Sequence, residues 1–75
     1  AKASQKEIFL KKLGKNITRL REEAGISQSE LALRCDKDRQ SLNRLEKGKI
    51  NPSAYYLLEI AAELNIPVNR LLEFE

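Results

Sequence analysis

Two glycines, Gly25 and Gly48, mark positions where helices are expected to stop, because glycine readily takes the left-handed conformation that ends a helix. Helix-start signals lie between them. Ser27-Gln28-Ser29-Glu30 is a capping box, in which two side chains accept backbone amide hydrogens. Asp38 can cap a further helix. The segment between the glycines is therefore expected to form two short helices separated by a turn of about three residues, 35–37.

The chain has 75 residues, of which 41% are hydrophobic and 33% are charged. This length predicts one domain, residues 1–75, with a small core. A single cysteine excludes an intrachain disulfide, so stability must come from helix packing or partly from a partner. Because there is no membrane-spanning run, no signal-peptide pattern and no cysteine pair, we expect a cytoplasmic protein without membrane association.

The net charge of +3 is unevenly distributed along the chain. Residues 1–21 carry seven Lys or Arg and one Glu, residues 22–51 carry six charges of each sign, and residues 52–75 carry one Arg and four Glu. This pattern indicates a polarised surface whose basic side faces a polyanion. A charge mixture that only keeps the protein soluble explains the same counts.

Helical periodicity predicts a first helix that begins near Gln5, after the capping box Ser4-Gln5-Lys6-Glu7. Gly14 within it costs about 1 kcal/mol relative to alanine, so the segment before Gly14 is expected to fray. The apolar residues recur by threes and fours on one face of this helix, and they are Phe9, Leu13, Ile17, Leu20 and Ala24.

Two more helices are expected after Gly48. Asn51-Pro52-Ser53 marks a loop and a helix start, and the amphipathic helix after it carries Leu57, Ile60, Ala61 and Leu64. Asn65 can end this helix in a left-handed conformation, and Pro67 fits the first turn of a last short helix. Strand-like alternation is missing from the sequence. The expected fold class is all-α, a compact five-helix bundle.

The short helices within the segment between Gly25 and Gly48 have distinct faces. The first should end near Arg34 and bury Leu31, Ala32 and Cys35. The second, about residues 39–47, buries Leu42 and Leu45, and its opposite face gathers Arg39, Gln40, Asn43, Arg44 and Lys47.

The polar face of residues 39–47 has the chemistry of base recognition. Arginine matches guanine, and asparagine or glutamine matches adenine, in the major groove of DNA. A solvated helix face is polar too, but it normally includes acids, and this face has none. Residues 27–48 also have the spacing of a helix-turn-helix, whose second helix enters the major groove.

From Leu13 to Leu72, about four fifths of the chain, the sequence resembles the XRE-type helix-turn-helix of phage repressor and Cro proteins. The resemblance implies a bacterial or phage-type regulator that binds a palindromic operator as a two-fold symmetric dimer. It is carried by Leu13-Gly14, Ile17, Leu20-Arg21, Gly25-Ile26-Ser27-Gln28, Leu31-Ala32, Glu46-Lys47-Gly48, Asn51-Pro52-Ser53 and Ile60-Ala61.

The resemblance also implies roles for individual side chains. Base contacts are implied for Arg39, Gln40, Asn43 and Arg44. Phosphate contacts are expected from backbone amides at the start of the second helix and in the loop at 49–51, and from the side chains of Gln28, Lys37, Lys47, Lys49 and Asn51.

The turn departs from the family pattern at three positions. Asp36 stands where glycine is usual, and it tolerates a left-handed conformation better than most residues. Lys37 replaces a commonly apolar residue and is expected to swing toward a phosphate. Asp38 places an anion near the DNA backbone, so backbone amides should bind its side chain.

Arg21 and Glu46 are expected to form a structural ion pair. Arg21 borders the apolar stripe of the first helix, and Glu46 follows Leu42 by four residues and therefore faces inward. Proteins of the family pair these positions across helices. We interpret the pair as orienting the recognition helix, about residues 39–47, rather than as contacting DNA.

The last eight residues contain more apolar side chains than a closing helix needs for its own packing. We expect a weak two-fold contact between two copies of the chain, as the family resemblance also suggests. The residues predicted to form this dimer contact are Val68, Leu71, Leu72 and Phe74.

Other candidate sites have structural interpretations. Cys35 is expected to be a core residue rather than a redox switch, and Tyr55 and Tyr56 are expected to pack rather than stack on bases. The residues around Gly48 form a helix stop rather than a phosphate loop. Without histidine, paired cysteines or convergent acids, no metal, cofactor or catalytic site is predicted, and we expect no enzyme.

The sequence thus favours a small stand-alone transcriptional regulator that consists of the DNA-binding domain alone. A repressor, an antitoxin and a restriction–modification controller fit it equally. An alternative is a protein-interaction module that binds a toxin or another regulator, with DNA binding secondary or lost. The polar face of residues 39–47 favours DNA, because a protein-binding face would be more apolar.

Overall fold

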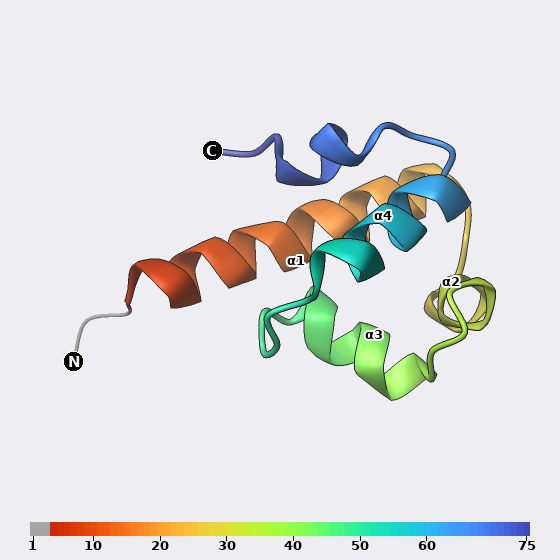
Figure 1. The fold of residues 1–75 in the computed structure, drawn as a ribbon, viewed down its shortest axis with the longest axis horizontal. Helices are drawn as coiled ribbons and strands as arrows, with labels where there is room; N and C mark the ends of the chain where they lie inside the picture. Colours follow the sequence, from red (N-terminus) through yellow and green to blue (C-terminus); the bar gives the residue numbers. More distant parts are fainter. Residues whose placement is uncertain (1–3) are drawn as a thin grey trace.

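The computed structural model describes residues 4–75, which form four α-helices and one short 3-10 helix (Figure 1). In Figure 1, α3 and the segment containing η1 lie on opposite sides of α1. No strand occurs within residues 4–75, so the predicted all-helical class is confirmed. The elements are α1 (Gln5–Glu23), α2 (Gln28–Arg34), α3 (Arg39–Glu46), α4 (Ala54–Glu63) and η1 (Val68–Leu72).

The expectation of five α-helices is wrong for the last element, because residues 68–72 form a 3-10 helix. Pro67 precedes this helix in an extended conformation instead of lying in its first turn, and no side chain caps the helix. Five residues without a cap are too few to stabilise an α-helix. Asn65 does adopt the predicted left-handed conformation, with a φ of 59°.

All four α-helices begin at a side chain that accepts a backbone amide hydrogen. In the predicted capping box at Ser4, the Ser4 hydroxyl accepts from the Glu7 amide at 3.1 Å and the Glu7 carboxylate accepts from the Ser4 amide at 3.3 Å. The second predicted box is half formed. Ser27 accepts from the Glu30 amide at 3.0 Å, but the Glu30 carboxylate accepts from Arg34 at 2.9 Å.

The core joins all five elements through side chains that are fully buried, among them Leu13, Ile17, Leu31, Leu42, Leu45, Ile60 and Leu71. The predicted stripe of α1 is wrong at its two ends. Leu10 is buried in place of Phe9, which is 44% exposed and packs beside Phe74 with 5.6 Å between ring centroids. Ala24 is exposed at the end of the helix. No helix within residues 4–75 combines the length and apolar character that crossing a bilayer requires.

Gly14 brings the backbones of α1 and α3 together. A Cβ at this position would lie 2.6 Å from the carbonyl oxygen of Leu45 and even closer to that of Glu46. The predicted fraying before Gly14 is not observed, because α1 is helical from Gln5 onward. The glycine therefore allows a contact that no larger residue permits, and this contact sets the position of α3.

We expect Gly14→Ala to lower the free energy of unfolding by about 2 kcal/mol, measured by urea denaturation. Alanine improves helix propensity by about 1 kcal/mol, but its methyl group would overlap backbone atoms that cannot rotate aside, and overpacking typically costs about 1–3 kcal/mol net. Lys15→Ala, at an exposed position of the same helix, is the control and should change stability by less than about 0.5 kcal/mol. A Gly14→Ala variant as stable as the unchanged protein would contradict the expectation.

Candidate nucleic-acid interface

A tight turn sets the angle between α2 and α3. Asp36 has a φ of 55°, in the left-handed region predicted for it, and the Lys37 amide donates to the carbonyl of Ala32 at 2.9 Å. Asp38 then caps α3, because its Oδ1 accepts from the Ser41 amide at 2.7 Å. The charge of Asp38 is thus directed at the first turn of α3, where the helix dipole favours an anion.

The exposed face of α3 is polar. Leu42 and Leu45 are 0% exposed, and Glu46 is buried, so no acidic side chain lies on this face. Three of the four predicted base-reading residues line one surface hollow of about 420 Å³, and these are Arg39, Gln40 and Asn43. The fourth, Arg44, is exposed on the same helix but does not line the hollow.

Beneath this face, Arg21 of α1 and Glu46 of α3 meet in a bidentate ion pair. The Nε and Nη2 atoms of Arg21 donate to the two carboxylate oxygens at 2.8 Å and 3.1 Å. The side chains are only 11% and 5% exposed, and the hydrogen bonds with Glu46 raise the pKa of Arg21 above its ordinary value. Arg21 Nη1 also donates to the Ile26 carbonyl at 2.9 Å, so the pair reaches the loop before α2.

Two amide side chains extend this ion pair toward the surface. Gln28 Nε2 donates to Glu46 Oε1 at 2.9 Å, and Asn43 Nδ2 donates to Gln28 Oε1 at 3.4 Å. Gln28, predicted only to contact phosphate, is therefore half-buried and bonded to the protein. Its place at the first turn of α2 is visible in the sequence, but its partners depend on how α2 crosses α3.

The lysines predicted to contact phosphate lie in the segments that flank α3. Lys37, Lys47 and Lys49 are exposed, as is Asn51. Lys37 Nζ lies 5.1 Å from the centroid of the Tyr56 ring, within the range of a cation–π contact. The loop that carries Lys49 begins at Gly48, which has a φ of 74° and packs on the backbone of Lys11 in α1.

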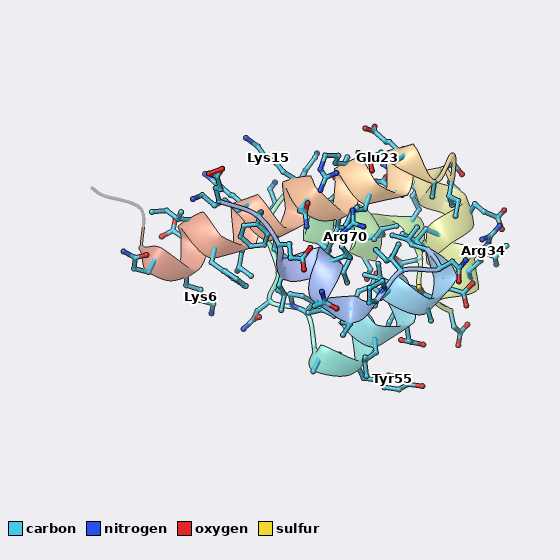
Figure 2. The ribbon with its side chains drawn as sticks, turned by 90° about the horizontal axis from the view of Figure 1, so that it is seen from above. Lys6, Lys15, Glu23, Arg34, Tyr55 and Arg70 are labelled. Atoms are coloured by element: carbon cyan, nitrogen blue, oxygen red, sulfur yellow. The ribbon has the colours of Figure 1, made fainter. Side chains whose placement is uncertain are left out.

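Cys35 and Tyr56 lie in the core beneath the turn, at 2% and 6% exposure. Burial raises the pKa of Cys35 to about 11, with Glu59 and Glu63 acting in the same direction, so the thiol is protonated near neutral pH. Burial also raises the pKa of Tyr56 to about 12. Packing was predicted for Tyr55 as well, but its side chain is 69% exposed and points away from α4 (Figure 2).

The predicted dimer contact is wrong for Leu71, which is 0% exposed and belongs to the core of its own chain. Of the remaining predicted residues, Leu72 is 48% exposed, whereas Val68 and Phe74 are partly buried against the core. Helix α4 packs against η1 and exposes Leu58. Apolar surface is thus present on both elements, although less of η1 contributes than the sequence predicted.

A buried asparagine attaches η1 to α1. Asn16 is 5% exposed, and its Nδ2 donates to the carbonyls of Arg70 and Leu71, each at 2.9 Å. Its Oδ1 accepts from Arg19 at 2.6 Å. The sequence does not indicate this role, because an asparagine beside an apolar stripe usually marks the border of the exposed face.

A family model described as helix-turn-helix matches residues 17–71. An uncharacterized HTH-type transcriptional regulator of Sinorhizobium fredii, y4dJ, is 39% identical over 56 residues, which cover 75% of this chain and 73% of that protein.

Solved structures share the fold over most of the chain. The restriction-modification controller protein C.AhdI from Aeromonas hydrophila is 34% identical, with a TM-score of 0.80 over 83% of this chain and 94% of its own. The hypothetical transcription factor NHTF from Neisseria is 28% identical, with a TM-score of 0.81 over 96% of this chain and 83% of its own.

We expect Arg21→Met and Glu46→Leu each to lower the free energy of unfolding by about 3 kcal/mol, because each leaves one buried charge without its partner. The double variant should cost less than the sum, with a coupling of about 1–3 kcal/mol, measured by urea denaturation. The exposed pair Arg34–Glu30 is the control, and its coupling should stay below about 0.5 kcal/mol. Simple additivity at Arg21 and Glu46 would show that the two residues do not interact.

Proposed function

The chain belongs to the XRE-type helix-turn-helix family, and we propose that it is a transcriptional regulator whose helix α3 reads double-stranded DNA in the major groove. The observation that carries this proposal is the face of α3, where Arg39, Gln40 and Asn43 line one hollow and no acid is exposed. Proteins of this family are transcriptional regulators rather than enzymes.

The proposed base contacts are those of Arg39, Gln40, Asn43 and Arg44. Guanidinium and amide groups make paired hydrogen bonds to guanine and adenine, which is how they discriminate between bases. Around them, exposed cations and amides supply sequence-independent affinity by binding phosphate, and we assign this role to Lys37, Lys47, Lys49 and Asn51. Because the side chain of Gln28 is bonded to Glu46, we propose that its phosphate contact is made through its backbone amide.

Among the regulator types that fit the sequence, a controller role has specific support. C.AhdI is a restriction-modification controller protein, and it matches this chain at 34% identity over 94% of its own length. Regulation of a restriction–modification operon is therefore the role that we propose to test first. No observation from residues 4–75 favours a toxin as partner.

We propose further that the protein occupies a palindromic operator as a weak homodimer. Leu72 and the partly exposed Val68 and Phe74 offer apolar surface on the C-terminal segment, and Leu58 offers more on α4. We expect a contact made by so few apolar side chains to be too weak to hold a dimer at low concentration. Binding to two half-sites would supply the remaining affinity, since the two-fold symmetry of a dimer matches that of a palindrome.

Selection of bound duplexes from a random pool tests the division between base and phosphate contacts. Gln40→Ala should relax the preference at one position of each half-site, with a loss of about 1–3 kcal/mol on the preferred sequence. Lys49→Ala should weaken binding to all sequences alike and reduce the slope of log affinity against log salt by about one unit. The assignment is wrong if Gln40→Ala leaves the selected sequence unchanged while Lys49→Ala alters it.

Sedimentation with a palindromic duplex tests the proposed dimer. We expect two chains per duplex at saturation and a monomer when the protein is dilute and free. Leu72→Asp should preserve the fold but weaken dimerisation by on the order of tenfold or more, because it places a charge in an apolar contact. Leu33→Asp is the matched control, since Leu33 is 73% exposed on α2, away from η1. A single chain per duplex at saturation would exclude the dimer.

A further inference from the structure

We propose that Glu46 fixes the orientation of the Asn43 side-chain amide, so that Asn43 presents its carbonyl oxygen to the groove and selects a base with an exocyclic amino group. The selected base would be adenine or cytosine. The proposal rests on the proposed function and adds to it the class of base that one residue reads. In it, Glu46 and Gln28 are positioning residues, and Asn43 determines specificity.

The orientation begins at the ion pair. The guanidinium of Arg21 can only donate hydrogen bonds, so both oxygens of the Glu46 carboxylate accept from it, at 2.8 Å and 3.1 Å. With its side chain 5% exposed, Glu46 is shielded from solvent that could compete for its remaining lone pairs. Any further neighbour of Glu46 must therefore present a hydrogen-bond donor.

Gln28 is the neighbour that meets this requirement, and its own orientation is fixed as a result. Its Nε2 donates to Glu46 Oε1 at 2.9 Å, and the reversed amide would place the Gln28 oxygen against the carboxylate. Two acceptors in contact repel, and a hydrogen bond to a charged group is worth about twice one between neutral groups. The oxygen of Gln28 is consequently directed toward Asn43.

Asn43 is the last member of this chain of amides. Its Nδ2 lies 3.4 Å from Gln28 Oε1, a long contact that contributes little energy. The orientation of the Asn43 amide is nevertheless determined, because a reversed amide would place the Asn43 oxygen against the Gln28 oxygen, and two acceptors repel. Asn43 also lines the hollow shared with Arg39 and Gln40. Within residues 4–75 its Oδ1 has no hydrogen-bond partner, so this oxygen is the acceptor available to DNA.

An acceptor in the major groove finds a donor on only two bases, at N6 of adenine and N4 of cytosine. Guanine and thymine present acceptors at the corresponding edge. Adenine should bind best, because its N7 can also accept the second hydrogen of Nδ2. Guanine also offers N7 to that hydrogen, but its O6 would face the Asn43 oxygen, and the two acceptors repel. A freely rotating asparagine lacks this restriction, since turning the amide over would let Nδ2 donate to O6.

Selection from a random duplex pool tests the proposal with the full chain and two substitutions. Asn43→Ala identifies the position that Asn43 reads, as the one whose preference disappears. The unchanged protein should select adenine or cytosine there, over guanine by on the order of tenfold. Gln28→Met removes the amide that holds Asn43, so guanine should be accepted at this position, with the discrimination reduced at least fivefold and the other positions unchanged.

Gln5→Met is the matched control, because it removes an exposed amide of α1 that lies outside this network and outside the proposed interface. It should leave the position read by Asn43 unaltered, and thermal melting of each variant checks that the fold is retained. Four results would overturn the proposal: selection of guanine or thymine by the unchanged protein, no affected position in Asn43→Ala, an unaltered preference in Gln28→Met, or an equal loss at all positions. Failure of the unchanged protein to enrich any sequence would instead contradict the proposed function.

Discussion

The buried ion pair between Arg21 and Glu46 connects the three helices that form the helix-turn-helix and its support. It joins α1 to α3, reaches the loop before α2 through the Ile26 carbonyl, and holds the Gln28 side chain at the start of α2. A buried ion pair adds little net stability over apolar packing. Its contribution here is to geometry, because one carboxylate that accepts from donors on α1 and α2 restricts how α3 can lie against those helices. Buried contacts between the helices thus determine the position of the exposed face of α3.

Close backbone approach completes what the ion pair begins. At Gly14 the α1 backbone touches the carbonyls at the end of α3, and at Gly48 the following loop packs on the backbone of Lys11. The ion pair determines how α3 is oriented against α1, whereas these backbone contacts determine how closely the two helices approach. Because neither contact depends on a flexible side chain, α3 and the loop that follows it are held as one rigid surface against α1. A rigid surface loses little conformational entropy on binding.

The sequence predicted the features that depend on neighbours along the chain. Cap residues such as Asp38, the left-handed Asp36 and Asn65, and the buried faces of α2 and α3 follow from local chemistry and helical periodicity. The predictions were wrong where the burial of a side chain depends on segments that are distant along the chain. The burial of Leu71 depends on how the segment after α4 returns over α1, and that of Leu10 in place of Phe9 depends on the contact with Phe74. For the same reason the sequence could not show that Gln28 would turn inward.

The attachment of η1 through Asn16 has an evolutionary consequence. The amide nitrogen of Asn16 donates to backbone carbonyls of residues 70 and 71 and to no side chain of η1, and Leu71 alone anchors η1 by a fully buried side chain. The outward side chains of this segment can therefore be replaced without loosening it from the body. If duplicated genes that encode such a domain diverge at these positions first, the dimer that we propose would let sister regulators in one cell pair with themselves and not with each other.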